Sequence, residues 1–494
     1  MTDSLSMSGQ NRTTTGPGAA LRLPTIIQGG MGVAVSNWRL ARAVSTYGQM
    51  GVVSGTGIDT VLVRRLQDGD PGGHLRRAMA SFPFPDIAKE TLRRYFLPDG
   101  LPSGKPYARL PLPKIEGSAL QRGITMLGNF TEVFLAKEGH DGPVGVNLLT
   151  KIQLPNLASL YGAMLAGVDY VLMGAGIPRE IPQVLDQFAQ HRPASIRADV
   201  IGGRRDAPVT FDFDPAEFDG ASLAPLQRPA FLPIVSSHSL ASMLLKKARG
   251  PIQGFVVEAP VAGGHNAPPR GGGALDERGQ PVYGERDEVD MGVMRDLGVP
   301  FWLAGGVGAP DQVREALALG ATGVQVGTAF AYCDESGLAP DLKRTVIAQA
   351  LAGGAEVHTD PRASPTGYPF KVVTLPGSNS EEAEYLQRKR VCDLGYLREV
   401  YETPTGKLGF RCASEPVDAF VSKGGELAET VGRKCLCNAL MANIGLPQVQ
   451  KGGDVERPIL TSGDDMDVIR RLLPPGRDSY TAAEVVDYLL GGVA

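Results

Sequence analysis

The residues with the clearest chemical potential lie at 256–271, which read VVEAPVAGGHNAPPRG. An apolar run ends at Glu258, a glycine pair follows at Gly263 and Gly264, and His265 comes next. An imidazole exchanges protons near neutral pH, and paired glycines let a ligand approach the backbone closely. The same letters also describe an ordinary turn with a surface histidine. The stretch predicts a ligand-facing histidine if Glu258 ends a buried strand whose following loop belongs to an active-site face.

Two more glycine loops follow apolar runs later in the chain. Gly305 and Gly306 come after one run, and Gly327 and Thr328 come after the next. In a β/α barrel, the loops after the seventh and eighth strands commonly hold a phosphate on backbone N–H groups, and a threonine hydroxyl adds a hydrogen bond. One such loop is as well explained by an ordinary turn between a strand and a helix. Two in adjacent positions favour a phosphate-bearing ligand.

The elements that position these loops repeat as short apolar runs, most of them ending in Gly, Ser or Asn, with helical segments between them. The expected strands are residues 25–28, 51–54, 142–148, 169–173, 231–235, 255–258, 300–304 and 323–326. Eight units of this kind predict an α/β fold, a closed (β/α)8 barrel of the TIM type. A doubly wound dinucleotide-binding sheet is disfavoured, because the glycine motifs at 30–32, 55–57 and 174–176 do not complete G-x-G-x-x-G/A.

The domain organisation follows from where this rhythm starts, breaks and stops. Residues 1–20 are rich in Ser, Thr, Gly and Asn and predict a disordered lead-in. The expected parts are a barrel at 21–350, insertions after the second and fourth strands at about 64–140 and 194–229, and a C-terminal extension at 351–494. Alternating residues at 209–213 predict a hairpin within the second insertion.

Composition excludes several classes of partner. The net charge of -4 leaves no basic surplus, so nucleic acid is not a favoured partner, and no basic block suggests a membrane surface. The chain has no apolar run of about 18 residues or more, and its N-terminus lacks the apolar core of a secretory signal. These features predict a cytoplasmic protein.

Four of the five cysteines fall close together near the C-terminus, at Cys392, Cys412, Cys435 and Cys437. In a reducing compartment such clustering indicates a metal more often than disulfides, and four thiolates suit an iron–sulfur cluster or zinc. The spacing matches no familiar metal motif, so buried free thiols remain the alternative. Cys333 is apart from this group and is expected in the core.

Six segments carry a resemblance to a known family. They are QGGMG at 28–32, GVN at 145–147, GAG at 174–176, EAPVAGGH at 258–265, AGG at 304–306 and ALALGATGVQVGTAF at 316–330. Together they resemble the nitronate monooxygenase family, formerly called 2-nitropropane dioxygenases, and equally its relatives, the FMN-dependent enoyl-acyl carrier protein reductases. The resemblance spans about residues 23–335 and covers neither the insertions nor the last 130 or so residues well. It implies a TIM-type barrel that binds FMN without covalent attachment.

The resemblance also implies roles for individual residues. The implied cofactor contacts are Gln28, Gly29, Gly30 and Met31 at the flavin ring, Asn147 and Glu258 at strand ends, Gly263 and Gly264 beside them, and Gly305, Gly306, Gly327 and Thr328 at the phosphate. His265 matches the catalytic histidine of the family. With a nitronate it would act as a base or offset the negative charge; in an enoyl reductase it would assist protonation or bind the acyl carbonyl.

Two further residues are candidates for substrate contact. Arg270 follows two prolines in a loop that departs from the usual glycine turn of the family, and its cation would suit an anionic substrate. Pairing with a nearby acid explains Arg270 equally well. His238 follows the fifth expected strand and would face the same end of the barrel, unless its neighbouring serines simply cap the next helix.

Three functions remain open from the sequence. The first is an FMN-dependent oxidoreductase that oxidises an alkyl nitronate, or a similar small anion, with O2. The second is a trans-acting enoyl reductase of a polyketide or fatty-acid pathway that uses NAD(P)H and acts on an acyl carrier protein. The third is a non-enzymatic sensor that binds flavin and metal. The fold does not separate them, because barrels of one kind support many chemistries, and the oligomeric state stays open.

Overall fold

The computed structural model describes residues 13–14, 20–21, 23–115, 117–204 and 206–491. Most of the predicted lead-in therefore lies outside the described residues. Within it, β1 (Thr13–Thr14) pairs antiparallel with β2 (Ala20–Leu21).

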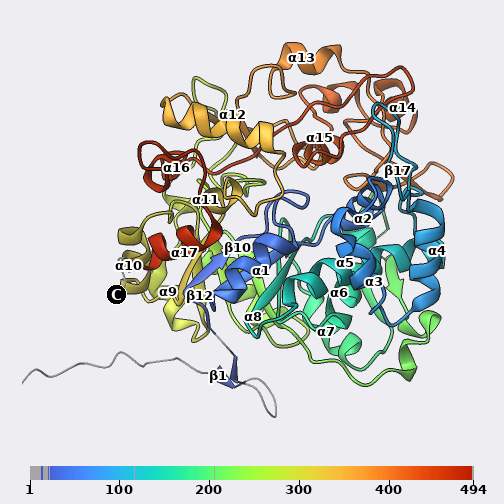
Figure 1. The fold of residues 1–494 in the computed structure, drawn as a ribbon, viewed down its shortest axis with the longest axis horizontal. Coiled ribbons are helices and arrows are strands. Elements are labelled where there is room, and N and C mark those ends of the chain that lie inside the picture. The colour runs from blue at the N-terminus through green and yellow to red at the C-terminus, as the bar shows by residue number, and fades with distance from the viewer. Residues whose placement is uncertain (1–12, 15–19, 22, 116, 205, 492–494) are drawn as a thin grey trace, which may run out of the picture.

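Eight parallel strands close into a barrel, as predicted (Figure 1). They are β3 (Ile26–Gln28), β4 (Met50–Ser54), β5 (Val144–Leu149), β6 (Tyr170–Gly174), β10 (Ala230–Val235), β11 (Phe255–Glu258), β12 (Phe301–Ala304) and β13 (Gly323–Val326). The barrel closes where β13 pairs with β3, with Val324 opposite Ile26 and Val326 opposite Gln28. All eight expected strands are present, so the predicted (β/α)8 fold is confirmed.

The strands are apolar on both faces because one face fills the barrel and the other meets the helices. The barrel interior is a cluster that includes Ile27, Val52, Leu172, Val256 and Trp302. The Trp302 indole N–H donates to the carbonyl oxygen of Pro24 at 2.7 Å, which satisfies its polar atom inside the barrel.

The outer helices are α1 (Trp38–Thr46), α5 (Ala119–Lys137), α6 (Gln153–Leu165), α7 (Ile181–Ala189), α8 (His238–Lys247), α9 (Met291–Asp296), α10 (Pro310–Ala318) and α17 (Ala482–Leu490). The stretch between β4 and β5, which includes the predicted first insertion, contributes α2 (Ile58–Gln67), α3 (His74–Met79) and α4 (Pro85–Tyr95). Its last helix, α5, packs against both α1 and α6. The structure thus assigns the end of the predicted insertion to the helical layer of the barrel.

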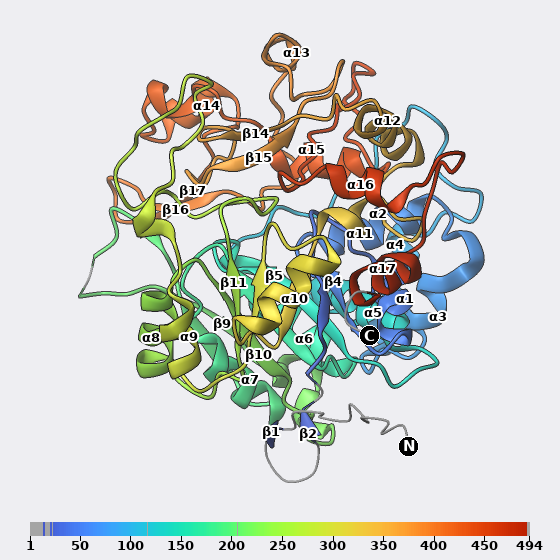
Figure 2. The same cartoon turned by 90° about the vertical axis from the view of Figure 1, so that its left-hand side faces the viewer.

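The helix that completes the barrel after β13 comes from the C-terminus. α17 contacts α1 and α10, the first and seventh helices of the outer layer, and therefore occupies the position of the eighth helix. Figure 2 shows α17 beside α1. Ala482, Val485, Val486 and Leu489 of α17 are buried there. The predicted C-terminal extension therefore leaves the barrel after β13 and returns to it at α17.

The second insertion forms the predicted hairpin, in which β7 (Ala194–Arg197) pairs antiparallel with β9 (Thr210–Phe213). Between them, β8 (Val200–Ile201) pairs in parallel with β16 (Glu399–Glu402), and β16 pairs with β17 (Leu408–Arg411). Two segments about 200 residues apart in the sequence thus share one small sheet.

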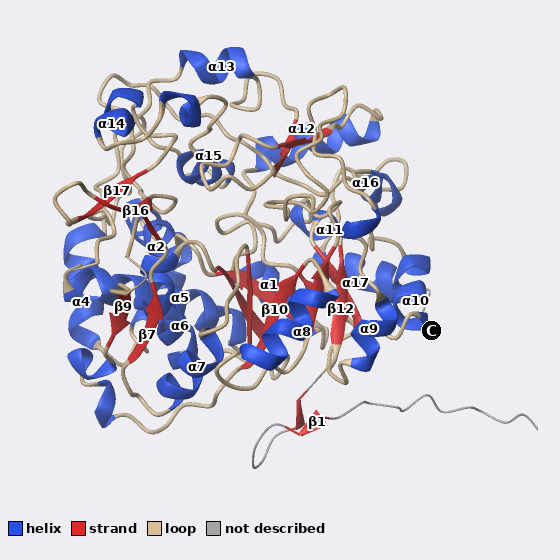
Figure 3. Cartoon of the chain, turned by 180° about the vertical axis from the view of Figure 1, so that it is seen from behind, coloured by secondary structure: helices blue, strands red, loops and turns tan. Residues whose placement is uncertain are grey.

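Residues 357–472, called the cover below, lie over one end of the barrel (Figures 2 and 3). The chain reaches the cover through α11 (Thr328–Ala331) and α12 (Pro340–Leu351). The elements of the cover are β14 (Val357–Asp360), β15 (Phe370–Val373), α13 (Glu382–Gln387), β16, β17, α14 (Val417–Ser422), α15 (Leu436–Asn443) and α16 (Asp467–Leu472).

Buried polar contacts tie the cover to α2. The hydroxyl of Tyr396 contacts Thr60 Oγ1 at 2.7 Å and donates to the carboxylate of Asp59, while Arg64 donates to the carbonyl oxygen of Leu446 at 2.6 Å. Among the described residues, no helix has the length and apolar character needed to cross a bilayer.

Candidate active site

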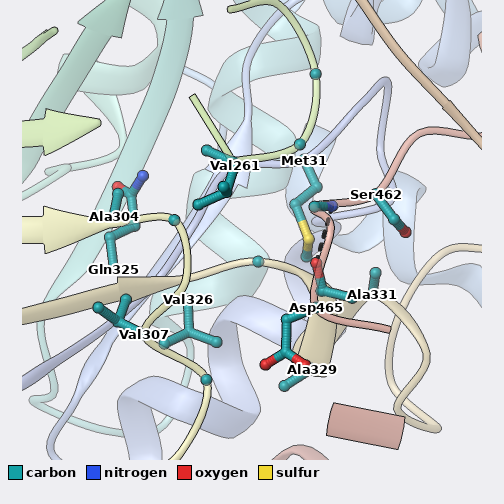
Figure 4. Close-up of a pocket in the computed structure, with 18 of the residues that line it drawn as sticks. Met31, Val261, Ala304, Val307, Gln325, Val326, Ala329, Ala331, Ser462 and Asp465 are labelled. Carbon is teal, nitrogen blue, oxygen red and sulfur yellow. Dashed lines mark hydrogen bonds between the residues drawn. The ribbon is translucent and has the colours of Figure 1, made fainter. Parts of the chain in front are cut away.

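Two adjoining cavities lie between the barrel and the cover. Cavity A, of about 160 Å³, is bounded by the loops after β11, β12 and β13 and by residues 461–465 of the cover. Cavity B, of about 150 Å³, is bounded by the ends of β4, β5, β6 and β11 and by α15. Figure 4 shows cavity A, where Met31, Gln325 and Ser462 project from separate segments of the chain. The end of the barrel at which the strands have their carboxyl ends is therefore the end that forms the site.

The predicted glycine loops line cavity A. Gly305 and Gly306 have φ values of 87° and 70°, a conformation that favours glycine. A Cβ on Gly305 would also lie 3.0 Å from the backbone nitrogen of Ala262, so this loop cannot carry a side chain without shifting. The backbone of residues 305–308 and of Gly327 is thereby exposed to the cavity, and its N–H groups suit an anion such as a phosphate.

The hydroxyl of Thr328 is shared with the cover. Thr328 Oγ1 accepts a hydrogen bond from the N–H of Gly463 at 3.0 Å, and a Cβ on Gly463 would lie 3.1 Å from the same oxygen. Because the hydroxyl hydrogen is still available, Thr328 can donate to a ligand while it anchors Gly463.

Two buried amide oxygens at the site have no hydrogen-bond partner among the described residues. They are Gln325 Oε1, on a residue that lines cavity A, and Asn147 Oδ1, on a residue that lines cavity B. The other end of the Asn147 side chain donates to the carbonyl oxygen of Gly30 at 3.2 Å, and a Cβ on Gly30 would come within 2.3 Å of Asn147 Cβ. Buried acceptors of this kind suit a polar ring bearing N–H groups, so the side chains present fit an FMN.

Cavity A holds no basic side chain among its described lining residues, which include two acids, Glu258 and Asp465. The carboxylate of Asp465 is paired with the guanidinium of Arg471. A phosphate in cavity A would therefore be bound mainly by backbone N–H groups, with the Asp465 charge offset by Arg471.

Glu258 ends β11 and lines both cavities. Its carboxyl makes no side-chain hydrogen bond within the described residues, and burial raises its pKa to about 8. Glu258 is consequently protonated and neutral at pH 7, and its O–H is available to a ligand.

His265 lines cavity B and is held by the cover. Its Nε2 lies 2.7 Å from Ser364 Oγ, which contacts Thr366 Oγ1 at 2.8 Å, and its ring packs edge-on against Phe370 with the centroids 4.8 Å apart. Burial, and next the positive charge of Lys151, lower the pKa of His265 to about 4. The imidazole is therefore neutral at pH 7, which suits a base or a hydrogen-bonding group and not a fixed positive charge.

The influence of Lys151 on His265 can be tested directly. Lys151→Met removes the nearby positive charge, so the pKa of His265 should rise, yet stay below 6.5 because the ring remains buried. NMR titration of the His265 ring protons measures this, with Lys246→Met, a change at an exposed lysine of α8, as the control. An unchanged or lower pKa in Lys151→Met would contradict the assigned cause.

The structure brings together most of the predicted site residues. Those lining cavity A or B are Gly30, Met31, Asn147, Glu258, Gly263, Gly264, His265, Gly305, Gly306, Gly327 and Thr328. Gln28 and Gly29 do not line either cavity. The Gln28 amide instead donates to Ser36 Oγ at 2.8 Å and accepts from the Val52 N–H at 3.0 Å, so it braces the loop that carries Gly30.

The two predicted substrate residues lie outside both cavities. Ser237 caps α8, and Nδ1 of His238 accepts from the N–H of Asp290 at 3.2 Å. The Arg270 guanidinium donates to the carbonyl oxygen of Ser236 at 2.9 Å and lines a small third cavity with Glu258. Contact of Arg270 or His238 with a substrate remains a prediction.

The four clustered cysteines are free thiols. Within the part of the chain that is described, no group of three or more His, Cys, Asp or Glu side chains could hold a metal ion. The predicted iron–sulfur or zinc site therefore has no geometric support. Cys437 lines cavity B, and burial raises its pKa well above that of a free thiol. Cys333 is buried, as expected.

The contribution of the cover to the site was not predicted. Thr461, Ser462 and Gly463 line cavity A, and Phe370, Tyr396 and Leu440 are among the cover residues that line cavity B. Ser364 lines neither cavity, but its hydroxyl is hydrogen-bonded to the His265 ring. The short run TSG at 461–463 is a turn signal, but its sequence gives no sign of a contact with β-strand loops more than 130 residues earlier.

Comparisons with known proteins agree with the motifs. The family model described as nitronate monooxygenase matches residues 195–366. A probable nitronate monooxygenase of Bacillus subtilis (strain 168) is 30% identical over 138 residues, which make up 28% of this chain and 37% of the relative. The match thus spans little more than a third of the length of that relative.

Solved structures that match the chain over most of its length, at low TM-scores, include two kinds of protein. FabK from Thermotoga maritima has a TM-score of 0.43 and 17% identity, covering 95% of this chain and 92% of its own. Nitroalkane oxidase from Streptomyces ansochromogenes has a TM-score of 0.42 and 14% identity, covering 95% of both chains. The sequence matches, and not these distant structures, carry the likeness: over residues 195–366 the chain is similar to the nitronate monooxygenase family, and this stretch holds three of the six motifs on which the predicted resemblance rests.

Proposed function

We propose that this protein is an FMN-dependent oxidoreductase of the nitronate monooxygenase type, with the FMN phosphate in cavity A, the flavin ring extending to the boundary with cavity B, and the substrate in cavity B. One observation carries the proposal: the cavity lined by the two glycine loops adjoins the cavity lined by His265, and the two share part of their walls. The relationship of residues 195–366 to nitronate monooxygenases supports the same class of reaction. Bound FMN would supply the redox chemistry.

The residues of the chain have separable tasks in this proposal. The backbone N–H groups of residues 305–308 and Gly327 bind the phosphate. Asn147 and Gln325 accept hydrogen bonds from the ring through their unpartnered oxygens. His265, held by Ser364, offers a neutral imidazole to the substrate. As a base its low pKa makes it weak, so its main task is to orient the substrate by a hydrogen bond.

A second candidate is the NAD(P)H-dependent reduction of an enoyl group carried by an acyl carrier protein. The walls of cavity B favour it, because they are largely apolar and include Leu149, Ile152, Ile234, Leu436 and Leu440. An aliphatic chain gains free energy from contact with such walls, at about 25 cal/mol per Å² of apolar surface removed from water. A small nitronate anion gains little from them.

Anaerobic spectroscopy of the purified protein tests both candidates. We expect a yellow protein with about one FMN per chain, because each chain has one proposed FMN site. If an alkyl nitronate bleaches the flavin band and air restores it, O2 is the oxidant and the first candidate holds. If NADPH bleaches the band and an enoyl thioester restores it, the second candidate holds. Bound flavin that responds to neither would favour the sensor, and a colourless protein that does not take up added FMN would overturn the proposal.

A further inference from the structure

The boundary between cavities A and B has an unusual composition. The residues that line both are Gly30, Gly32, Glu258, Gly263, Gly264 and Thr461. Among these shared described residues, Glu258 is the one with a titratable side chain. Any group that moves a proton between a ligand in cavity A and a ligand in cavity B would best be placed at this boundary.

Glu258 and His265 differ in what they can do there. His265 lines cavity B alone, and its Nε2 is engaged with Ser364. Glu258 reaches both cavities and has no side-chain partner among the described residues. The carboxyl of Glu258 is thus free to donate its proton. His265, by contrast, is neutral at pH 7 and lacks the additional proton that an imidazolium could donate.

We propose that Glu258 is a catalytic acid, which delivers a proton to the substrate at the boundary of the two cavities. The proposal rests on the proposed function, and it deepens the second candidate, because reduction of a carbon–carbon double bond requires a proton. A nitronate is already an anion and would need no such acid for its oxidation.

The step balances as follows for an α,β-unsaturated acyl substrate. Bound reduced FMN would supply the hydride that the β carbon receives and would be oxidised in doing so. The π electron pair of the double bond then forms a C–H bond at the α carbon with the proton from the Glu258 O–H, and Glu258 is left as a carboxylate that regains a proton from solvent. His265 can hold the acyl carbonyl only through an N–H, which its neutral form supplies at one ring nitrogen.

Other charged and titratable groups face Glu258 from three sides. Arg270, Tyr283 and Asp287 share the small third cavity with it, Asp465 lies in cavity A, and His265 lies in cavity B. Arg270 is exposed and Asp465 is paired with Arg471, so both act on Glu258 through screened or compensated charges. Burial remains the dominant cause of its raised pKa.

The experiment compares Glu258→Gln, Glu258→Asp and the control Glu288→Gln in the FMN-loaded protein, with NADPH and a crotonyl thioester. Glu288 is an exposed acid that lines neither cavity A nor cavity B. Glu258→Gln should lower kcat about 10²- to 10⁴-fold with FMN still bound, as expected for loss of an acid, and Glu258→Asp should retain part of the rate. Glu288→Gln should match the wild type.

The pH dependence of the rate distinguishes acid catalysis by Glu258 from a purely structural role, because a structural role would leave that dependence unchanged. The rate of the wild type should fall as pH rises through about 8, where Glu258 loses its proton, and this fall should be absent in Glu258→Gln. Infrared difference spectra of the resting protein should show a buried carboxylic acid that titrates with the same pKa and is missing in Glu258→Gln.

The outcomes separate the two levels of the proposal. A wild type that binds FMN but reduces no enoyl thioester overturns the second candidate and, with it, this role for Glu258. An active wild type overturns the role of Glu258 alone if Glu258→Gln keeps more than about a tenth of its rate, or if no carboxylic acid titrates near pH 8. If Glu258→Gln fails to fold, the activity of Glu258→Asp and the infrared titration of the wild type decide.

Discussion

Replacing Leu489 by alanine is expected to lower the free energy of unfolding by about 2–5 kcal/mol, the usual cost of truncating a fully buried leucine. Leu489 is 0% exposed on α17, the helix that completes the outer layer of the barrel between α1 and α10. Urea denaturation followed by circular dichroism measures the change. The matched control is Asp487→Ala, an exposed residue of the same helix, which should change the stability by less than about 0.5 kcal/mol.

The result bears on how the C-terminal residues are used. If α17 were a loosely attached tail, Leu489→Ala would behave like Asp487→Ala. Equal stability of the two variants would therefore contradict the assignment of α17 to the barrel.

The second large effect is expected at Gly30, where alanine should reduce FMN affinity by at least about tenfold, equivalent to 1.4 kcal/mol. A Cβ at this position would lie 2.3 Å from Asn147 Cβ and 2.9 Å from Asn147 Nδ2. The backbone of the loop or the side chain of Asn147 must therefore move, and both line cavity B, where Gly30 also borders cavity A. Fluorescence titration of the apoprotein with FMN measures the affinity.

Gly273→Ala is the matched control for Gly30→Ala. Gly273 has ordinary φ and no atom within 4 Å of an added Cβ, so alanine fits there without strain. Full FMN affinity in Gly30→Ala would mean that the loop at Gly30 is not part of the flavin site.

The strands were predictable from the sequence because each is a local pattern. A run such as 255–258 is apolar on both faces and ends at a polar residue and a glycine loop, which is what a barrel strand requires. The glycine loops at Gly305 and Gly327 were predictable for the same reason, and their place at adjacent strand ends follows from the strand order.

The rest depends on contacts that no local pattern encodes. α17 is an ordinary amphipathic helix, and only packing against α1 and α10 makes it the last barrel helix. Ser364 is one serine in a proline-rich stretch, yet its side chain is fully buried against His265. The cysteines suggested a metal because four thiols lie close together in the sequence, but all four are free thiols whose pKa is raised by burial, which keeps them neutral.

The long excursion between β13 and α17 has a consequence for biosynthesis. A chain emerging from the ribosome exposes its N-terminal parts first, and domains tend to fold as they emerge. All eight strands are synthesised by residue 326, but α17, the helix that packs against α1 and α10, follows only at residues 482–490. During that interval the cover is made while the helical layer of the barrel is incomplete, so a nascent chain would expose apolar surface until α17 arrives. Ribosome-bound chains stalled before residue 482 should therefore be the ones that chaperones retain.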